Sequence, residues 1–330
     1  MKLNEIGEFN LIQRLSAMAN QHNSNTKQNG IVRGIGDDSA AWQNQSSMTL
    51  ATTDCLVQGV HFNSGDVPWY DLGCKAMAVN ISDIAAMGGR ARFALITLGL
   101  PQSCTVENIE ELYAGLLDTS QNYGVSIIGG DLSSCDTLFI NIALMGQSEK
   151  QVMTRDGAQV GDQIALTGFT GLASAWLREE KHDKITEEAK NTLKQAFWRP
   201  QPRLLEGIKL LDAGVCAAID ISDGLTADLE HICKASKVSA VVNIKHVPIH
   251  PILNEYFNGQ ALDMALGGGE DYELIFTAKP GVMSHVINTL QIPCYVIGEI
   301  IDNPQSKVFL MNPDGTQYFP SSKGWNHFGQ

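Results

Sequence analysis

The chain is poor in basic residues. Its 330 residues include 23 Lys and Arg against 36 Asp and Glu, which gives a formal net charge of -13. Such a surface disfavours nonspecific binding to nucleic acid or to an anionic membrane, because both carry negative charge. If the ligand is a phosphate compound, few fixed cationic side chains can neutralise it. Metal cations would then have to supply much of the counter-charge.

Paired cysteines and long apolar runs are also missing. The seven cysteines form no C-x-x-C pair, and their number is odd. A disulfide framework or a zinc site is therefore not expected, and a reducing cytoplasm fits better. The first residues include Glu5 and Glu8 and no apolar stretch, so no secretory signal is predicted. No apolar run approaches the roughly 18 residues of a membrane helix, and no membrane partner is expected.

The familiar phosphate-binding loops are absent. A Walker A loop requires a lysine after its second glycine, and the Gly-rich stretch TGFTGLAS (residues 167–174) has none. The stretch GIGDDS (residues 34–39) lacks the third glycine of a dinucleotide fingerprint, and its two acids would repel a pyrophosphate. A nucleotide would therefore have to be held by another device.

What the chain does contain is a mixture of strands and helices in two parts. The length fits two domains or one large domain, and the composition shifts at the segment SEKQ. We therefore expect an N-terminal domain at residues 1–150 and a C-terminal domain at residues 151–330. Because strands and helices alternate throughout, the expected class is α/β or α+β.

Individual elements follow from periodicity and end signals. Apolar and small-residue patterns predict helices at residues 4–19, 70–87 and 105–124. The third has Thr105 at its start, a residue type favoured at N-caps. A run rich in Thr, Val and Leu predicts a strand at residues 48–62.

Acidic residues follow buried-looking strands or glycines at many points, and this is the dominant signal in the sequence. Each acid is expected to project from a strand end into a loop, where sites of α/β proteins are commonly built. Taken singly, such an acid is often a helix cap or an Asx turn, and this structural role is favoured for Asp38 and Asp271. The set comprises Asp37, Asp38, Asp54, Asp83, Asp131, Asp220, Asp223, Glu270 and Asp271.

Many acids in a chain poor in basic residues would repel one another if they converged. Convergence is tolerable only with cations present, and Mg²⁺ prefers oxygen ligands and bridges carboxylates to substrate phosphates. The pattern therefore predicts a site for several Mg²⁺ ions. Within GIGDDS, we expect Asp37 to bind the metal and Asp38 to fix the turn or support its neighbour.

Four other side chains have both a structural and a functional interpretation. His61 alternates with apolar residues, so a strand histidine is the default, and Tyr113 lies on a helix face where aromatics usually pack. Arg155 could meet a phosphate or pair with Asp156. Trp325 could fill a packing gap or stack on a flat ligand ring.

One short internal echo is present. The tetrapeptides at residues 80–83 and 220–223 share the letters I-S-D, and each precedes a stretch that contains small residues. The match either arises by chance or reflects two half-molecules with similar acidic turns.

The motifs of the chain, in their order, resemble those of the thiamine-monophosphate kinase family. They are GIGDDSA, TTDCLVQGVHF, KAMAVNISDIAAMGG, IIGGDLS, TRDGAQVGDQIALTGFTG, AIDISDGLTADL, GGGEDYELIFT and the terminal KGWNHF. Each motif alone is modest, but the ordered set is highly specific. The resemblance implies the two-domain fold of the aminoimidazole ribonucleotide synthetase-like superfamily. In that fold, N-terminal strands form a barrel across a homodimer, and ATP lies in the cleft.

The resemblance also implies roles for matching residues. Oxygen ligands of Mg²⁺ would be Asp37, Thr52, Thr53, Asp54, Asp83, Asp131, Asp220 and Asp223. The catalytic members of this set would be Asp54, Asp83, Asp131 and Asp220. The nucleotide would contact Tyr113, Gly130, Asp131, Arg155 and Ser222. The thiamine end of the substrate would contact His61, Glu270 and Trp325, with Phe328 as the alternative to Trp325.

The reaction implied is phosphoryl transfer from ATP to the phosphate of thiamine monophosphate, giving thiamine diphosphate and ADP. Both reactants are anions, so the transfer needs alignment and charge neutralisation more than covalent chemistry. The acceptor phosphate has a second pKa of about 6, so it is largely deprotonated near neutral pH and needs no general base. Direct in-line transfer without a phosphoenzyme is therefore expected.

Other functions compete with this interpretation. A selenophosphate synthetase would be expected to carry an early reactive Cys, and the first 40 residues contain none. The related hydrogenase maturation protein ends in a reactive Cys, whereas this chain ends NHFGQ. Aminoimidazole ribonucleotide synthetase itself fits the tail less well. A nucleotide sensor without turnover and a metal-dependent phosphatase are the alternatives from other classes.

Overall fold

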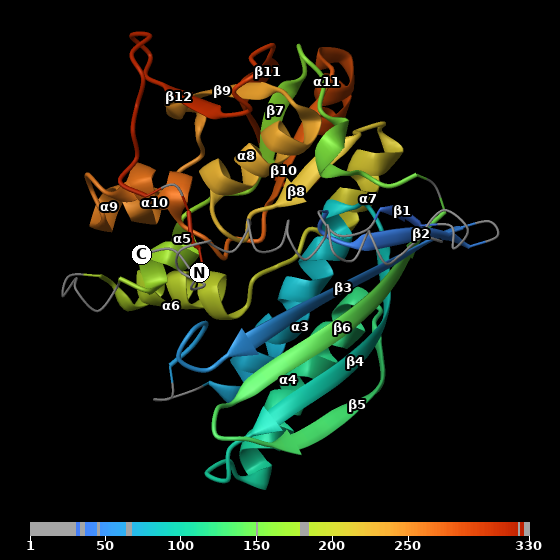
Figure 1. The fold of residues 1–330 in the computed structure, drawn as a ribbon. Coiled ribbons are helices and arrows are strands. Elements are labelled where there is room, and N and C mark those ends of the chain that lie inside the picture. Colours follow the sequence, from blue (N-terminus) through green and yellow to red (C-terminus); the bar gives the residue numbers. More distant parts are fainter. Residues whose placement is uncertain are drawn as a thin grey trace, which may run out of the picture.

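Two six-stranded sheets dominate the computed structural model (Figure 1). The predicted helix at residues 4–19 and the alternative ligand Phe328 lie outside the described part of the chain. The described residues are 31–33, 37–44, 47–63, 68–149, 151–178, 185–322 and 324–326.

The first sheet has the strand order β1-β2-β3-β6-β4-β5. Neighbouring strands are antiparallel except β4 and β5, which are parallel. Parallel neighbours need a crossover connection, and helix α4 supplies it. The strands are β1 (Ile31–Arg33), β2 (Ala40–Asn44), β3 (Ser47–Val57), β4 (Arg90–Leu100), β5 (Ser126–Ser134) and β6 (Phe139–Ser148).

Two long helices accompany this sheet, and both confirm the prediction from periodicity. Helix α3 spans Trp69–Ala86 and helix α4 spans Val106–Tyr123. The Thr105 side chain accepts a hydrogen bond from the Asn108 backbone N–H, and the Asn108 side chain accepts one from the Thr105 N–H. This reciprocal cap satisfies two backbone donors that the first turn leaves unpaired. Gly124 ends α4 in the left-handed conformation.

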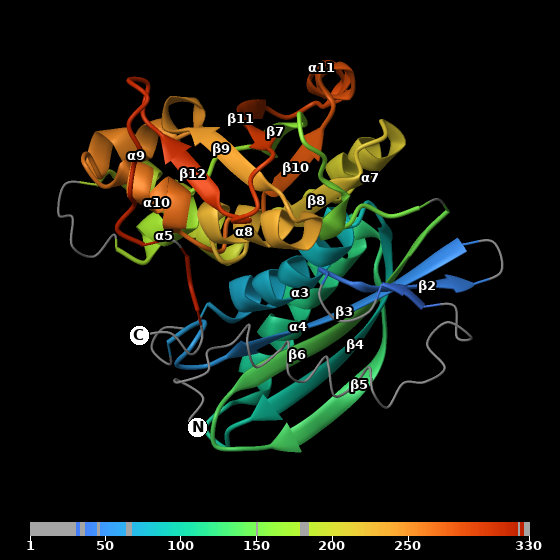
Figure 2. The same ribbon diagram turned by 45° about the horizontal axis from the view of Figure 1, so that its top comes forward.

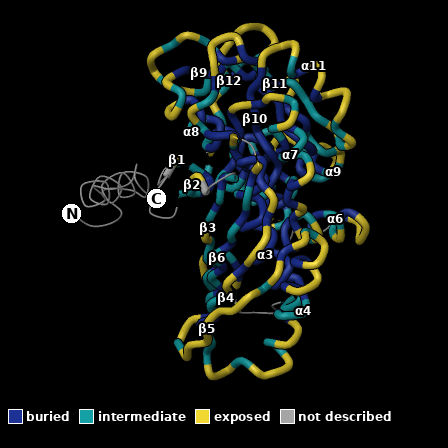
Figure 3. Tube along the Cα trace, turned by 90° about the vertical axis from the view of Figure 1, so that its right-hand side faces the viewer, coloured by how far each residue is buried: buried dark blue, intermediate teal, exposed yellow. Residues whose placement is uncertain are grey.

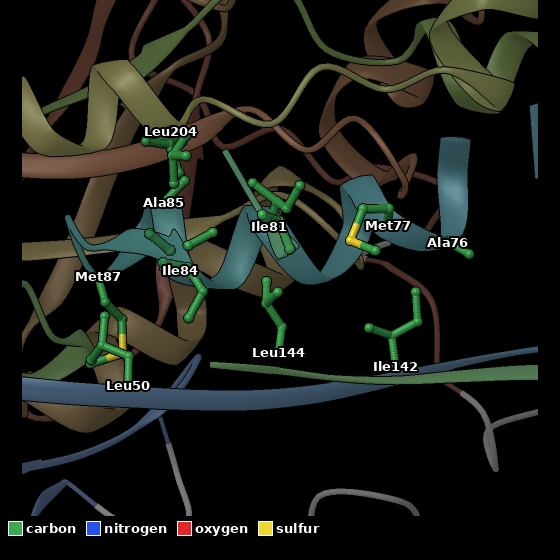
Figure 4. Packing of buried hydrophobic residues seen from close by; sticks show 14 of the residues in the cluster. Leu50, Ala76, Met77, Ile81, Ile84, Ala85, Met87, Ile142, Leu144 and Leu204 are labelled. Carbon is green, nitrogen blue, oxygen red and sulfur yellow. The ribbon is translucent and has the colours of Figure 1, made fainter. Parts of the chain in front are cut away.

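Helix α3 is buried on nearly all sides because it lies between the first sheet and the C-terminal half of the chain (Figures 1 and 2). Its sheet-facing side chains, including Met77, Ile81 and Ile84, pack over Leu50 and Ile142 (Figure 4). Each such side chain contributes about 1.5–3 kcal/mol when fully buried. A helix that is apolar all round is typical of such a position.

The opposite side of α3 meets helix α7 (Leu204–Asp212), where the backbones approach closely. A Cβ atom built at Gly207 would lie 2.0 Å from the carbonyl oxygen of Ala85. Only glycine fits at position 207, because any side chain there would collide with the backbone of α3. The contact attaches the C-terminal half to the helix that carries Asp83.

The second sheet has the order β12-β9-β11-β7-β10-β8, antiparallel except for β12 beside β9. Its strands are β7 (Gln163–Thr167), β8 (Ala217–Asp220), β9 (Ser239–Asn243), β10 (Leu274–Ala278), β11 (Cys294–Ile301) and β12 (Val308–Met311). The remaining α-helices are α5 (Leu172–Trp176), α6 (Glu187–Trp198), α8 (Leu225–Ser236), α9 (Pro251–Tyr256), α10 (Ala261–Gly267) and α11 (Pro280–Thr289). Short 3-10 helices occupy Arg155–Gly157 (η1) and Ile244–His246 (η3).

The expected strand at residues 48–62 is too long. Strand β3 ends at Val57, where the Val57 N–H donates to Nδ1 of His61 over 2.9 Å. Gly59 has φ 82°, so the chain turns back and pairs with Phe62. The alternation of residue types continues into the turn, so the sequence pattern does not show where β3 ends.

The first sheet is open within one chain, with β1 and β5 at its edges. A two-domain α/β fold is therefore present, while the barrel across a homodimer remains a prediction. Among the described residues, no helix is both long and apolar enough to cross a bilayer.

Candidate functional site

Three acids from distant parts of the chain meet between the two sheets. Carboxylate oxygens of Asp38, Asp83 and Asp220 all lie within 4.8 Å of one another. Asp220 is the last residue of β8, which confirms the prediction that this acid lies at a strand end. Asp83 instead lies inside helix α3. We refer to these residues together with Asp54 as the acid cluster.

Strand alternation brings Asp54 into this cluster. Successive side chains of a strand point to opposite faces, so Asp54 shares the α3-facing side with Thr52 and the buried Leu56. The Thr52 hydroxyl donates to Asp83, and the Asp54 backbone N–H donates to the Asn80 side chain over 3.0 Å. Asp54 therefore lies in mid-strand, and its expected place at a strand end was wrong.

Burial and mutual repulsion disfavour ionisation of the cluster. Burial, and then the nearby Asp38 carboxylate, raises the pKa of Asp54 to about 6. The pKa values of Asp83 and Asp220 are raised well above the ordinary value, again first by burial and then by neighbouring carboxylates. At neutral pH these oxygens need a positive charge among them. A compact set of carboxylate and hydroxyl oxygens matches the ligands that Mg²⁺ prefers.

Arg155 is the cation built into this region. Its Nε and Nη2 donate to the two carboxylate oxygens of Asp38 over 3.2 and 2.9 Å. Asp156 pairs with Arg33 over 2.6 Å, so the suggested pairing of Arg155 with Asp156 was wrong. The bidentate geometry holds Asp38 at the cluster in a fixed orientation.

The two acids of the GIGDDS turn have different surroundings. One oxygen of Asp37 accepts from the Asp38 N–H and the other from the Arg155 N–H, each over 3.1 Å. Burial and Asp38 raise the pKa of Asp37 to about 7. The oxygens of Asp38 lie beside Asp83 and Asp220. Both residues are thus placed to serve a cation, and the preference for Asp37 stays a prediction.

A second group of predicted residues meets beside the cluster through backbone hydrogen bonds. The Glu270 N–H donates to the Ser222 carbonyl over 2.7 Å, and the Trp325 N–H donates to the Asp223 carbonyl over 2.9 Å. Glu270 has φ 67°, a left-handed conformation that is uncommon for a non-glycine residue and often marks functional sites. Segments from β8–α8, α10–β10 and the C-terminal tail therefore form one loop cluster.

Asp228 organises this loop cluster. It is 2% exposed, and one of its oxygens accepts the backbone N–H groups of Ser222, Asp223 and Gly224 over 3.0–3.1 Å. Its carboxylate oxygens and those of Asp223 lie within 4.8 Å of a ring nitrogen of His231. Burial, and then Arg155, lowers the pKa of His231 to about 4.

Two predicted metal ligands lie on the other face of the first sheet. Thr53 points away from Asp54, and its hydroxyl contacts Asn141 over 3.2 Å. Asp131 is exposed in mid-strand on β5 and pairs with Thr97, so it also does not follow a strand end. Three strand steps separate β3 from β5. Within one chain, neither side chain joins the acid cluster.

The predicted nucleotide contacts Tyr113 and Gly130 lie on helix α4 and strand β5, respectively. Tyr113 lines an apolar pocket of about 550 Å³ at the Leu100 end of β4, together with Val106 and Ile109. A Cβ atom at Gly130 would lie 1.8 Å from the Ile96 carbonyl oxygen, so the strand pairing itself requires glycine there. Gly130 thus has a structural reason independent of any ligand.

The sequence patterns did not predict roles for Asn80, Ser82 and Asp228. The first two belong to the tetrapeptide at residues 80–83, which was noticed only as an internal echo. The two copies of that echo differ in structure, since residues 80–83 are helical while residues 221–223 mostly form a loop. Two half-molecules with similar acidic turns are therefore not what the structure contains. Asp271 has the structural role expected of it, because it accepts the Gly171 N–H over 2.7 Å.

Family models match both halves of the chain. The model described as AIR synthase related protein, N-terminal domain, matches residues 36–148, and the corresponding C-terminal domain model matches residues 159–311.

Curated relatives match over nearly the full length. Thiamine-monophosphate kinase of Aquifex aeolicus (strain VF5) is 33% identical over 99% of this chain and 100% of its own length. The Bacillus subtilis (strain 168) enzyme of the same name is 34% identical over 97% and 99%. The solved structure described as AaThiL complexed with AMPPCP and TMP has a TM-score of 0.86 and 31% identity, and covers 99% of both chains.

Proposed function

Since the chain belongs to the thiamine-monophosphate kinase family, we propose that it transfers the γ-phosphoryl group of ATP directly to the phosphate of thiamine monophosphate. The products are thiamine diphosphate and ADP. The observation that carries the proposal is the convergence of Asp38, Asp54, Asp83 and Asp220 in one buried cluster. The neighbour described with AMPPCP and TMP supports the choice of both substrates.

The oxygen atoms in and beside the acid cluster suit Mg²⁺, and we propose that this region holds several ions. The protein ligands would be Asp37, Thr52, Asp54, Asp83 and Asp220, with Asp223 for a further ion. Mg²⁺ held by these residues would supply the positive charge that neutralises the phosphates of both substrates. Arg155 does not replace it, since its guanidinium is already paired with Asp38.

The chain's own residues then align the reaction. Thr52 and Ser82 hold Asp83 and Asp220 by hydrogen bonds, so these carboxylates have fixed positions before substrate arrives. Fixed ligands orient both phosphates for in-line attack, which is where most of the catalysis of phosphoryl transfer arises. The acceptor oxygen is already ionised, so the mechanism assigns no general base.

The loop cluster of Ser222, Asp223, Glu270 and Trp325 is placed to bind the substrates beside the reacting phosphates. Ser222 would contact the nucleotide, while Glu270 and Trp325 would contact the thiamine end. His61 lies in the turn after β3, two residues beyond Gly59, and is proposed as a further contact to thiamine.

A homodimer would cover the open face and outer edge of the first sheet. Apolar side chains are exposed there at Phe93, Leu95, Ile128 and Leu132, and Figure 3 shows exposed stretches along β4 and β5. We propose that a second copy packs on this face. Thr53, Tyr113, Gly130 and Asp131 lie apart from the acid cluster of their own chain, so their proposed ligand contacts would depend on that assembly.

We further propose a division of labour between the domains. Residues 1–150 would bind ATP and Mg²⁺ and form the dimer, and residues 151–330 would complete the nucleotide and thiamine sites. The expected location is the cytoplasm.

Product analysis tests the proposal most directly. The protein is mixed with ATP, Mg²⁺ and thiamine monophosphate, and the products are separated by chromatography. Equal amounts of thiamine diphosphate and ADP are expected. Release of inorganic phosphate alone would indicate a phosphatase, and unchanged ATP would indicate a sensor. In-line transfer further predicts inversion at a chiral γ-phosphorus, since retention requires an intermediate.

A further inference from the structure

Lys75 on helix α3 is a buried lysine to which neither the resemblance nor the acid cluster gives a role. It is 1% exposed, and in the described part of the chain no other lysine or arginine is buried. Its Nζ lies 2.9 Å from Oε1 of Glu270 and 3.4 Å from the ring centroid of Phe197. A buried ammonium is costly unless it is paired, so these partners must account for its presence.

Of the two members of the Lys75–Glu270 pair, only Glu270 is accessible to solvent. The Glu270 side chain is 22% exposed, whereas the Lys75 side chain is 1% exposed. Phe197 is buried as well, at 2%. A ligand in the loop cluster can therefore touch Glu270 but neither Lys75 nor Phe197. Any effect of Lys75 on a ligand must be transmitted through Glu270.

Glu270 is thereby held from two directions. Its backbone has the left-handed φ of 67°, and its N–H donates to the Ser222 carbonyl. These two features fix the direction in which the Glu270 side chain projects. Its Oε1 is held by Lys75, which is itself fixed over the Phe197 ring. A cation over an aromatic face is attracted by the ring quadrupole, so Lys75 has little freedom to move. The orientation of the Glu270 carboxylate is set before any ligand binds.

We propose that Lys75 is a positioning residue for recognition of the thiamine end, acting through Glu270. It engages one carboxylate oxygen and leaves the other as a hydrogen-bond acceptor for an N–H donor of the ligand. Because Lys75 neutralises Glu270, the pair selects a donor such as the pyrimidine amine rather than a bare positive charge. The inference rests on the proposed function, which supplies the substrate.

The test compares Lys75→Met, Glu270→Gln and the double variant, with Lys234→Met as the matched control. Lys234 pairs with Glu230 over 3.1 Å, but its side chain is 59% exposed. Affinity for thiamine monophosphate is measured by calorimetry with AMPPCP and Mg²⁺ present, alongside steady-state KM values for both substrates. A second ligand carries a carbonyl in place of the pyrimidine amine.

Loss of the ion pair that orients Glu270 should also cost the charge-assisted contact of Glu270 with the ligand, so Lys75→Met is expected to weaken binding of thiamine monophosphate by about 10- to 100-fold. The KM for ATP should change less than about twofold, the size expected of an unperturbed site. The double variant should bind no worse than Glu270→Gln alone, because both changes remove one interaction. Discrimination against the carbonyl ligand should collapse in Lys75→Met, and Lys234→Met should match the wild type.

Additive losses in the double variant, or unchanged discrimination in Lys75→Met, would overturn the inference. If Lys75→Met fails to fold, Phe197→Leu replaces it, since this change removes the ring under Nζ without touching the ligand. Its expected effect is a smaller loss of affinity with the same loss of discrimination, and unchanged discrimination would again refute the role. Absence of product from the wild type would refute the proposed function instead, since calorimetry reports on Lys75 without turnover.

Discussion

The hydroxyl of Ser82 on helix α3 donates a 2.6 Å hydrogen bond to Oδ2 of Asp220 at the end of strand β8, across 138 positions of sequence. This bond links helix α3, which packs on the first sheet, to the edge strand β8 of the second. It also favours the charged form of Asp220 and so opposes the rise in pKa that burial causes. The position and the charge of one proposed metal ligand thus depend on the other half of the chain.

Ser82→Ala should therefore weaken the response to Mg²⁺. Without the donor, ionised Asp220 is less favourable, and the Mg²⁺ concentration for half-maximal activity should rise by about 10- to 100-fold, the range for a lost bond to a charged group. Titration of activity with Mg²⁺ measures this shift. Ser284→Ala is the matched control, because the exposed Ser284 hydroxyl only donates to the Pro280 carbonyl. An unchanged Mg²⁺ response in Ser82→Ala would show that the bond is merely structural.

Asp54→Asn should separate activity from stability. Turnover should fall by about 10³-fold or more if Asp54 contributes to charge neutralisation in the transition state. In metal-free buffer at pH 7.5, however, the variant should be more stable by about 1–3 kcal/mol, since each pKa unit corresponds to about 1.4 kcal/mol. The reason is that the pKa of Asp54 is raised to about 6, so its ionised form destabilises the folded state.

Kinetics and chemical denaturation in EDTA measure these two effects of Asp54→Asn. Asp314→Asn serves as control, because that carboxylate lies in an exposed turn with Thr316. Near-native turnover at saturating Mg²⁺ would remove Asp54 from the proposed site.

Stabilisation by Mg²⁺ should grow with pH. Burial raises the pKa of Asp54 to about 6 and of Asp37 to about 7 from an ordinary value of 3.8. In the metal-free folded protein, both carboxyls keep their protons to higher pH than in the unfolded chain. Between about pH 4 and 7, their contribution to the free energy of unfolding therefore falls as pH rises. Mg²⁺ must displace these protons, so binding is weak at the acid end.

The measurement is the difference between Tm in Mg²⁺ and Tm in EDTA, taken from pH 5 to pH 8. This difference should be small at pH 5 and level off above about pH 7, the higher of the two folded-state pKa values. Subtraction removes the opposite contribution of His231, whose pKa is lowered to about 4. A difference that is constant across the range would contradict the link between these carboxyls and the metal.

Trp325→Ala should act mainly on the thiamine substrate. Loss of one stacking contact predicts a rise in KM for thiamine monophosphate of about 3- to 10-fold, with little change in kcat. Phe319→Ala is the control, since this tail aromatic is 74% exposed. An unchanged KM in Trp325→Ala would transfer the stacking role to Phe328.

Leu95→Arg should disrupt the proposed dimer. Leu95 is 40% exposed on the uncovered face of the first sheet, where its cross-strand partners are Ala143 and Gly129. A buried guanidinium there would lack a partner, so light scattering after gel filtration should show a monomer. Leu205→Arg places the same charge on helix α7 at a residue that is 67% exposed, and should leave the assembly intact. A wild type that is monomeric at all concentrations would refute the dimer itself.

Local sequence predicted the long helices well. Helix α4 has its cap at Thr105 and its end at Gly124 because both signals act within one turn of the backbone. The turn at His61 was missed because it depends on a side chain that accepts a backbone N–H from four positions earlier. The surrounding alternation of residue types gave no sign of it.

The acids show the limit of local reasoning more sharply. The sequence predicts both Asp54 and Asp131 at strand ends, yet both lie in mid-strand. The register of the sheet places Asp54 on the α3 side and Asp131 on the open face, and a shift of one residue would exchange these faces. Asp54 pairs with Ile142, 88 positions along the chain, and Asp131 pairs with Thr97, 34 positions back.

The sequence alone determined the kind of chemistry. A chain rich in acids, poor in basic residues and without a phosphate loop is expected to neutralise phosphates with metal ions, and its ordered motifs point to one family of kinases. Only the tertiary structure decided which acids meet. Asp38, Asp83 and Asp220 come together because α3 packs between two sheets, and Arg155 is committed to Asp38 by the same packing. Contacts between residues so far apart depend on the folded core, and no spacing along the chain encodes them.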